Sequence, residues 1–405
     1  MYNLVIHGYL LGVMLASLFD KKVATMWKGE RQAIDMLRSK IEPDARYIWF
    51  HAASLGEFEQ GRPLMERIRR DYPEYKILLT FFSPSGYEVR KNYEGADIIC
   101  YLPLDTNRNA LAFLSTVKPV MAFFIKYEFW YNYLHILKER NIPTYSVSSI
   151  FRKEQVFFKW YGKHYSKVLK CFTRFFVQNE RSRQLLSMRG IDAVDVVGDT
   201  RFDRVLQIKA ASKRLPVVEA FKNGAKVFVA GSSWQPDEEI FIRFFNDHPD
   251  WKLVIAPHVI SDDHLRQIMS RLKRKVVRYT MTDAVEAADA DVLIIDCFGL
   301  LSSIYRYGEV AYVGGGFGVG IHNVLEAAVW EVPVFFGPNN KRFREAQGLK
   351  RSGGGFEITS YEEFEKAMSA FISQPDTICR AGKAAGEYVQ SLSGATDKIM
   401  DAINF

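Results

Sequence analysis

Short apolar runs alternate with amphipathic stretches twice along this 405-residue chain. In the first series, from residue 46 to residue 200, the runs are YIWF, KILLTFF, ADIICYL, VMAFFI, PTYSVSS and TRFFVQ. In the second series they are AKVFVAG, WKLVIAPH, ADVLIID, EVAYVGG and VPVFFG. The stretches between runs, such as residues 62–71 and 130–140, have the period of helices. This alternation predicts parallel strands joined by crossover helices, and the pause between the series predicts two doubly wound α/β domains.

The length of the chain also favours two domains of about 200 residues each. A mixed polar stretch at residues 206–224 is predicted to link them, so that the first domain covers residues 23–205 and the second covers residues 225–405. From residue 361 to the end the pattern is helical, and these terminal helices can pack back on the first domain.

The N-terminal segment, residues 1–22, is largely apolar. No basic stretch precedes the apolar residues, as a secretory signal requires, and Asn3 and His7 weaken the segment as a spanning helix. We expect a helix that lies on a membrane surface, with the lysines that follow it near the headgroups. The alternative is a buried first helix of the soluble fold.

Charge and cysteine usage set further limits. The net charge of +7 suits an anionic ligand or an anionic membrane surface but selects neither. The four cysteines follow no CxxC or zinc-binding spacing, which indicates reduced thiols in a cytoplasmic compartment.

Three charged residues follow predicted strands of the first domain, where open parallel sheets bind their ligands. Glu57 ends the motif HAASLGE at a strand-to-helix turn, where the helix dipole favours a carboxylate that can accept a proton from a hydroxyl; a helix-capping glutamate is the alternative. Glu128, in KYEFWYN, is either partly desolvated by aromatic neighbours or solvated beside core aromatics. Arg201, in GDTRFDR, either clamps a carboxylate or phosphate, or forms an interdomain ion pair with Asp199 or Asp203.

A glycine-rich loop is the strongest signal in the second domain. The stretch 310–337, VAYVGGGFGVGIHNVLEAAVWEVPVFFG, matches neither GxGxxG nor GxxxxGK[ST], so neither a nicotinamide site nor a P-loop is supported. The amides of the helix after the glycines can hold phosphate and Glu326 can hold a ribose diol, whereas the alternative is a tight structural turn. Pro257 and His258 also follow a strand and can line a base or phosphate pocket, although a lone histidine is more often structural. The DAD triplet at 289–291 precedes a strand and is interpreted as a polar turn, not as a metal-binding DxD motif.

Six motifs, in this order and at these separations, resemble the 3-deoxy-D-manno-octulosonic acid (Kdo) transferases of lipid A assembly: HAASLGE, KYEFWYN, GDTRFD, GSSW, APH and GIHNVLEAA. The resemblance covers nearly the whole chain, including the N-terminal segment. It implies the GT-B fold, with two Rossmann-like domains facing a cleft. It further implies an inverting transfer of Kdo from CMP-Kdo to the tetraacylated lipid A precursor, lipid IVA, in lipopolysaccharide biosynthesis. No metal ion or other cofactor and no nucleic acid would take part, and the enzyme would act at the cytoplasmic side of the bacterial inner membrane.

The resemblance also implies roles for individual residues. Glu57 would be the general base that activates the sugar hydroxyl of the lipid, and Glu128 and Arg201 would stabilise the transition state. The residues in contact with CMP would be Pro257, His258, Phe298, Gly299, Leu300, Asn323, Val324, Leu325 and Glu326. Two departures bear on the acceptor site, because many members have ETELWPN where this chain has KYEFWYN, and a lysine where Arg201 stands.

Two other functions are compatible with these motifs. One is another GT-B sugar-nucleotide enzyme, such as a UDP-sugar transferase or an epimerase, which a preference for UDP over CMP would identify. The other is a non-catalytic scaffold that binds a nucleotide and a membrane, which the charged trio of Glu57, Glu128 and Arg201 disfavours.

Overall fold

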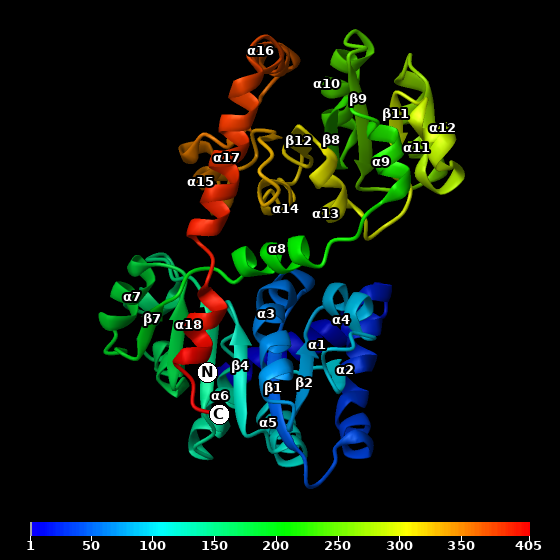
Figure 1. Ribbon diagram of the computed structural model, residues 1–405. Coiled ribbons are helices and arrows are strands. Elements are labelled where there is room, and N and C mark those ends of the chain that lie inside the picture. Colours follow the sequence, from blue (N-terminus) through cyan, green and yellow to red (C-terminus); the bar gives the residue numbers. More distant parts are fainter. Residues whose placement is uncertain (1) are drawn as a thin grey trace. The chain divides into compact units, whose positions relative to one another are not determined.

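The computed structural model describes residues 2–405, which form two compact units (Figure 1). The first unit comprises the chain up to Arg204 together with Ser393–Phe405, and the second comprises Val205–Leu392. Each unit is built on a parallel sheet of seven strands with helices between the strands. This arrangement confirms the predicted doubly wound α/β fold in both halves of the chain.

The strands of the first sheet follow the order β3-β2-β1-β4-β5-β6-β7. Their bounds are β1 (Arg46–Ala52), β2 (Tyr75–Phe81), β3 (Ile98–Tyr101), β4 (Met121–Ile125), β5 (Thr144–Ser149), β6 (Arg174–Val177) and β7 (Val194–Val196). The helices of this unit are α1 (Tyr2–Ala16), α2 (Lys21–Lys40), α3 (Leu55–Asp71), α4 (Pro84–Arg90), α5 (Asn107–Val117), α6 (Tyr131–Glu139), α7 (Glu180–Ser187) and α18 (Ala395–Asp401), with 3-10 turns η1 (Val156–Phe158) and η2 (Tyr165–Cys171). All six apolar runs predicted as strands in this half are strands.

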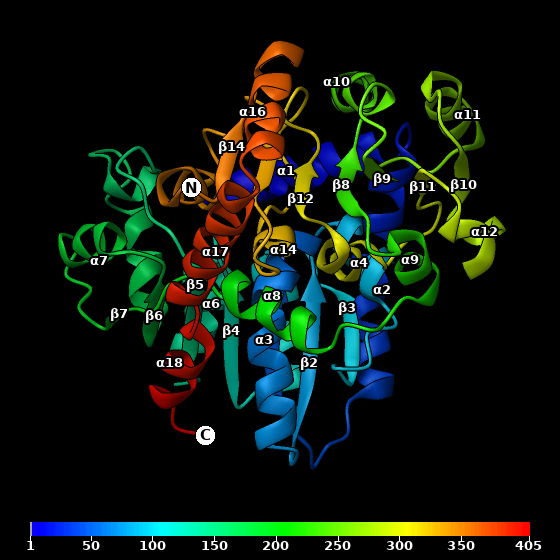
Figure 2. The same ribbon diagram turned by 45° about the horizontal axis from the view of Figure 1, so that its top comes forward.

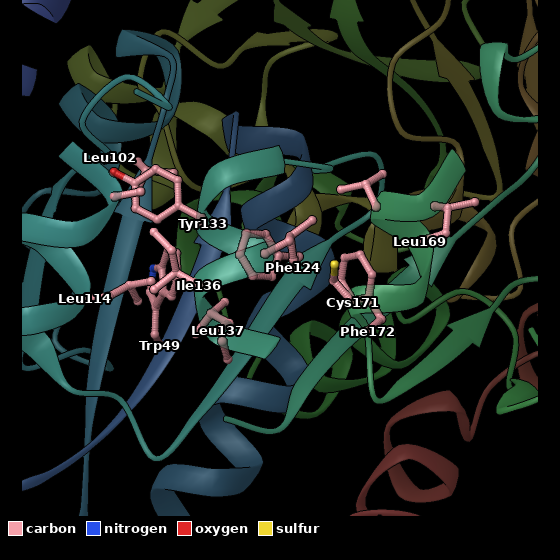
Figure 3. Packing of buried hydrophobic residues seen from close by; sticks show 14 of the residues in the cluster. Trp49, Leu102, Leu114, Phe124, Tyr133, Ile136, Leu137, Leu169, Cys171 and Phe172 are labelled. Carbon is pink, nitrogen blue, oxygen red and sulfur yellow. The ribbon is translucent and has the colours of Figure 1, made fainter. Parts of the chain in front are cut away.

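The central strand β1 is buried on both faces because helices cover both sides of its sheet. Successive side chains of a strand point to opposite faces, so its residues divide between two cores. Trp49 packs on one side with Tyr133 of α6, their ring centroids 5.6 Å apart (Figure 3). Phe50 belongs to the core on the other side, together with Leu64 of α3 and Ile399 of α18. Successive apolar residues of this one short strand therefore contribute to the cores beneath both layers of helices.

The C-terminal segment, Ser393–Phe405, belongs to the first unit, so the second unit ends at Leu392 and not at residue 405, and the last helix packs back on the first unit as the sequence analysis allowed. The Asp203 carboxylate accepts hydrogen bonds from the backbone N–H groups of Gly394 and Thr396, at 2.6 and 2.7 Å. A carboxylate at this position is favourable because the N-terminal end of a helix, here α18, carries partial positive charge. At the other end of the segment, Phe405 stacks on Tyr72 with ring centroids 4.2 Å apart.

The stretch 206–224, predicted as a linker, is mostly helical and forms part of the second unit. It contains the second half of α8 (Arg201–Ala210) and the whole of α9 (Pro216–Lys222). Proline suits the first turn of a helix, and Val218 and Phe221, one turn apart, are fully buried. The few apolar residues of this polar stretch are therefore spaced to bury one helix face, which explains why it is ordered.

The strands of the second sheet follow the order β10-β11-β9-β8-β12-β13-β14, and all of them except β13 are labelled in Figure 2. Their bounds are β8 (Lys226–Ser233), β9 (Trp251–Pro257), β10 (Val276–Arg278), β11 (Val292–Ile294), β12 (Val310–Val313), β13 (Val334–Phe336) and β14 (Gly355–Glu357). The remaining helices are α10 (Gln235–Asn246), α11 (Asp262–Arg271), α12 (Ala284–Ala288), α13 (Leu301–Ile304), α14 (Leu325–Ala328), α15 (Arg344–Ser352), α16 (Tyr361–Ser373) and α17 (Pro375–Ser391), with 3-10 turns η3 (Tyr279–Met281) and η4 (Tyr305–Tyr307). The two edge strands of this sheet, β10 and β14, have three residues each and were not predicted from the sequence.

Helix α1 lies on the first unit with most of its apolar side chains exposed. Only Val13 is buried among its residues, whereas Leu4, Leu11 and Leu15 are 79%, 59% and 57% exposed. The hydroxyl of Tyr2 donates to the Asp105 carboxylate at 2.7 Å and ties the start of the helix to the unit. The alternative of a buried first helix is therefore wrong. Within residues 2–405, no helix combines the length and apolar character that crossing a bilayer requires.

Candidate active site

The first sheet reverses its strand order between β1 and β4, which are neighbours. Ligands of open parallel sheets bind beyond the carboxyl ends of the strands at such a switch point. Glu57 follows β1 and Glu128 follows β4, so the fold brings to one edge two carboxylates that are 71 positions apart in the chain (128 minus 57).

Glu57 lies in the first turn of α3, where the sequence predicted a strand-to-helix turn. Its Oε2 accepts a hydrogen bond from the backbone N–H of Ala53 at 2.7 Å. Ser54 occupies the N-cap position without a side-chain hydrogen bond of its own, so the glutamate supplies the acceptor that the start of this helix needs. The capping role considered as an alternative is therefore present in the structure, and it fixes the direction of the carboxylate.

The protonation of Glu57 is also set by its surroundings. Burial raises its pKa to about 7, and the Glu128 carboxylate adds to the increase against the opposing effects of the Ala53 amide and the Lys126 ammonium. A carboxyl group with a pKa near 7 can take up a proton and release it near neutral pH, as a general base must. The position and the pKa of Glu57 thus suit proton abstraction from a hydroxyl.

Glu128 is held by two donors. Its Oε2 accepts from the indole Nε1 of Trp130 at 2.5 Å and lies 3.1 Å from Nε2 of His51. The other ring nitrogen of His51, Nδ1, lies 2.9 Å from the hydroxyl oxygen of Thr80, which also accepts from Trp49 Nε1 at 2.8 Å. Because an ionised carboxylate can only accept, this network assigns a proton to Nε2 of His51. Glu128 is therefore desolvated and oriented, as its aromatic neighbours suggested, and is not a freely solvated side chain.

Arg201 is engaged by an ion pair in its own unit. Its Nη2 and Nε donate to Asp199 Oδ2 at 2.8 and 3.0 Å. Burial alone would raise the pKa of Asp199, but the charge and hydrogen bonds of Arg201 hold it below the ordinary value. The ion pair with Asp199 considered in the sequence analysis thus forms within the first unit. The other candidate partner, Asp203, caps α18 instead.

The segment that carries Arg201 is fastened to α3. The Asp199 carboxylate accepts from Gln60 Nε2 at 3.2 Å, and the Thr200 hydroxyl donates to the backbone carbonyl of Gln60 at 2.6 Å. Gln60 lies one turn after Glu57 on the same helix. The structure therefore links the Arg201 segment to the Glu57 helix, although the two are far apart in sequence.

Two residues near this edge hold a left-handed backbone without being glycine. Lys126, directly after β4, has φ 66°, and Ser148 in β5 has φ 54° where the register shifts between its neighbours. The Ser148 hydroxyl lies 2.8 Å from that of Thr200, and Lys126 donates its backbone N–H to Val147 O at 2.8 Å. Such strained positions persist where surrounding contacts fix them, and they gather at functional sites.

In the second unit the strand order reverses between β8 and β12. The glycine-rich loop follows β12, and its start is anchored by the buried Asp237 carboxylate, which accepts from Gly315 N at 2.9 Å and from the Tyr312 hydroxyl at 2.7 Å. Gly315 has φ 92°, which glycine adopts without strain. At the end of β8, Ser232 has φ 51° beside another register shift. The loop is therefore both a tight turn and an array of backbone groups beside the switch point.

Three rings form a stack next to this loop. Trp234 lies against His258 with centroids 4.6 Å apart, and His258 lies against His322 with centroids 4.4 Å apart. Trp234 Nε1 also donates to His322 Nε2 at 3.3 Å. Burial lowers the pKa of both histidines, and His258 lowers that of His322 further. Two neutral imidazoles beside a glycine loop can donate hydrogen bonds to a phosphate and become cationic when it binds.

The other residues predicted to contact a nucleotide have different environments. Glu326 accepts from Ser302 Oγ at 2.5 Å and from Asn323 Nδ2 at 3.1 Å, so α13 and α14 hold its carboxylate in place. The turn before α13 contains Phe298, which is 80% exposed, Gly299 with φ 89°, and Leu300. Val324 and Leu325 are fully buried, and the strand-end residue Pro257 is buried as well. For Val324 and Leu325, only the backbone is then left to contact a ligand.

Several residues that build the two sites were not singled out from the sequence. They are His51, Thr80, Trp130, Gln60 and Asp237. His51 lies in the motif HAASLGE and Trp130 lies in KYEFWYN. Their closeness in sequence to Glu57 and Glu128 was therefore the signal that could have identified them. Thr80, Gln60 and Asp237 act through contacts that depend on strand order or helix packing and leave no local pattern.

Comparison with known proteins identifies relatives along most of the chain. A family model described as 3-Deoxy-D-manno-octulosonic-acid transferase (kdotransferase) matches residues 27–204. The 3-deoxy-D-manno-octulosonic acid transferase of Haemophilus influenzae is 24% identical over 375 residues, which cover 89% of this chain and 87% of that protein. The protein of the same name from Aquifex aeolicus is 27% identical over 335 residues, with 80% and 86% covered.

Solved structures share the fold of this chain. The UDP-GlcNAc 2-epimerase from Neisseria meningitidis bound to UDP-GlcNAc has a TM-score of 0.60 at 13% identity and covers 88% of this chain and 98% of its own. MurG from Acinetobacter baumannii has a TM-score of 0.55 at 10% identity, with 88% and 99% covered. At these identities the two structures show the shared fold alone.

Proposed function

We propose that this chain, a glycosyltransferase with the GT-B fold that belongs to the Kdo transferase family, transfers Kdo from CMP-Kdo to a lipid A precursor in lipopolysaccharide synthesis. The observation that carries the proposal is the position of Glu57. Glu57 lies on the turn after β1, next to the switch point of the sheet, and its pKa is raised to about 7.

The donor is held by the second unit. The neutral imidazoles of His258 and His322 face the phosphate of CMP, assisted by amides of the glycine-rich loop. Glu326, oriented by Ser302 and Asn323, accepts hydrogen bonds from the ribose hydroxyls. The exposed Phe298 ring packs on the cytosine.

The acceptor hydroxyl is activated by Glu57. In its ionised form the carboxylate takes the hydroxyl proton as the oxygen attacks the anomeric carbon of Kdo, and the bond to CMP breaks. Attack from the face opposite the leaving group inverts the anomeric configuration, and the transition state is oxocarbenium-like, as in related glycoside hydrolases. Glu128 stabilises the positive charge that develops, and the ion pair of Arg201 with Asp199 holds the adjoining segment in position.

The departure of CMP requires little acid catalysis. The phosphate leaves as an anion whose charge can be taken up by the histidines and the loop amides. We therefore propose that the transfer step uses no metal ion, and that activity persists in EDTA.

The acceptor we propose is lipid IVA at the cytoplasmic face of the bacterial inner membrane. The support is the apolar, largely exposed surface of α1, followed by Lys21, Lys22 and Lys28 of α2. A surface helix of this composition lies in the interfacial region of a bilayer, with the lysines at anionic headgroups. Phosphorylated lipid headgroups would then reach the first unit without leaving the membrane.

The decisive experiment is transfer of Kdo from freshly generated CMP-Kdo to the tetraacylated lipid A precursor, with products weighed by mass spectrometry. We expect the wild-type protein to add Kdo, with or without EDTA, and Glu57→Gln to lose activity by about 10² or more. Glu66→Gln, on the same helix and paired with Arg62, is the matched control and should keep full activity.

Failure of the wild-type protein would point to the other candidates. If it binds UDP in preference to CMP and makes no Kdo product, it is another sugar-nucleotide enzyme. If it binds CMP but transfers nothing from any sugar nucleotide, it is a scaffold. Normal activity of Glu57→Gln would remove Glu57 from the mechanism.

A further inference from the structure

The first unit contains a cavity formed by α1, α2 and the segment between β3 and α5. Its volume is about 620 Å³, and its lining includes Leu10, Trp27, Glu30, Arg31 and Arg108. None of the residues assigned above to the base, to the transition state or to CMP belongs to this lining.

Glu30, on α2, is an unusual residue to find in such a wall. It is only 4% exposed, and its Oε1 is buried with no hydrogen-bond partner among residues 2–405. Leaving a buried carboxylate oxygen without a donor costs free energy, so a group of this kind needs an explanation. Burial raises the pKa of Glu30 to about 8, as expected for a carboxyl group that has lost water and gained no partner. A ligand that brings an N–H donor into the cavity would satisfy this oxygen.

Two arginines supply the opposite charge. Arg31 and Arg108 line the same cavity, both are exposed, and neither has an ion pair with a carboxylate in the described part of the chain. The Arg31 guanidinium lies 5.8 Å from the centroid of the Trp27 ring, which limits where it can point. Arginine binds phosphate through two parallel hydrogen bonds. The cavity therefore combines two exposed phosphate-binding groups with a buried acceptor.

The surroundings of the cavity indicate what carries such a headgroup. Its wall includes α1, whose Leu11 and Leu15 are exposed on the surface of the unit. These side chains offer an apolar surface for acyl chains whose headgroup enters the cavity. The cavity and its surroundings therefore bring together apolar side chains that suit acyl chains, arginines that suit a phosphate and a carboxylate that suits an ammonium group.

We propose that this cavity binds the headgroup of phosphatidylethanolamine, with its phosphate on Arg31 and Arg108 and its primary ammonium donating to Glu30. The site attaches the protein to one class of phospholipid and is independent of the sugar donor. A quaternary ammonium has no N–H to donate, so phosphatidylcholine satisfies only the arginines. Phosphatidylglycerol likewise brings the phosphate without an ammonium.

The test measures binding of soluble dihexanoyl phospholipids to the full-length protein by titration calorimetry. Dihexanoyl phosphatidylethanolamine should bind at least about 10-fold more tightly than the phosphatidylcholine and phosphatidylglycerol of the same chain length, which is about 1.4 kcal/mol. Glu30→Gln should remove this preference and leave the weaker binding of phosphatidylcholine unchanged. Arg31→Gln should weaken all three lipids, and Asp35→Asn, an exposed residue of α2 outside the cavity, should change none.

Equal binding of the three lipids by the wild-type protein, or no binding, would overturn the proposal, as would a preference that persists in Glu30→Gln. Tighter binding of phosphatidylglycerol would show a phosphate site without an ammonium contact, which also overturns it. The wild-type comparison needs no variant, so it decides the matter even if Glu30→Gln does not fold. Because no sugar nucleotide is present, failure here leaves the proposed transfer reaction unaffected.

Discussion

Nε2 of His51, in β1, lies 3.1 Å from Oε2 of Glu128, which follows β4. This contact connects the two strands at which the first sheet reverses its order, and His51 is fully buried where it forms. A buried imidazole between a hydroxyl and a carboxylate holds that carboxylate in one orientation. We infer that His51 is a positioning residue, which acts on the reaction through Glu128.

Replacing His51 by phenylalanine should test this role. The variant keeps an aromatic ring but removes the hydrogen bond to Glu128, so we expect the free energy of unfolding to fall by about 1–3 kcal/mol and kcat to fall with it. Trp130→Phe removes the other donor to the same oxygen and should lower kcat in the same way. CMP affinity should not change in either variant. A change in CMP affinity with unchanged kcat would contradict a role through Glu128.

The dependence of transfer on pH should follow the ionisation of Glu57. Only the ionised carboxylate can accept the hydroxyl proton, and the pKa of this group is raised to about 7. Activity at saturating donor should therefore rise as pH increases through about 7 and level off above it. A profile that stays flat from pH 5 to pH 8 would exclude Glu57 as the titrating base.

Charge changes near Glu57 should move this profile in opposite directions. The Glu128 carboxylate raises the pKa of Glu57 and the Lys126 ammonium lowers it. We expect the rising limb of the residual activity of Glu128→Gln to shift to lower pH, and that of Lys126→Gln to shift to higher pH. Shifts of the same sign would show that another group titrates.

Affinity for CMP should increase as pH falls. His258 and His322 have pKa values below the ordinary value in the free protein, and an anionic phosphate beside them favours their protonated forms. Calorimetry between pH 8 and pH 5.5 should show tighter binding at the lower pH. His322→Asn should weaken binding about 10-fold and flatten this dependence. His248→Asn, which lies on Phe244 in α10 away from the glycine loop, is the control and should behave like the wild type.

Membrane attachment should depend on the exposed face of α1. Leu11→Glu combined with Leu15→Glu places two charges where apolar side chains are 59% and 57% exposed, so folding should be unaffected. We expect the double variant to lose its binding to vesicles that contain anionic lipids, whereas its affinity for CMP should be unchanged. Met188→Glu, at an exposed residue at the end of α7, should bind vesicles like the wild type. Unchanged binding of the double variant would assign attachment to another surface.

Much of the fold was predictable because its signals are local. Each of the eleven apolar runs read as strands contributes to a sheet, since strands covered on both faces are continuously apolar. The edge strands β10 and β14 were not predicted, because a run of three residues is too short to distinguish from a loop. The helix α9 was not predicted, because its buried face needs only a few apolar residues, such as Val218 and Phe221.

The site was less predictable because it depends on contacts between distant segments. The turn that places Glu57 could be read from the strand before it and the helix after it. The hydrogen bond of His51 to Glu128 required knowledge that β1 and β4 are adjacent, which the alternation of strands and helices does not specify. The pairing of Arg201 with Asp199 was one of several local possibilities, and packing of that segment on α3 selected it.

The return of the last residues to the first unit has a consequence for synthesis. The core around Phe50 includes Ala395, Ile399, Met400 and Ile403, which follow the whole of the second unit in the chain. Domains generally fold as the ribosome releases them, in order from the N-terminus. Here the strands of the first sheet are made early, but its core stays open until the residues after the second unit have been made, so the second unit can complete its fold before the first. A truncated messenger that stops at residue 204 would encode every strand of the first sheet and still leave its core uncovered.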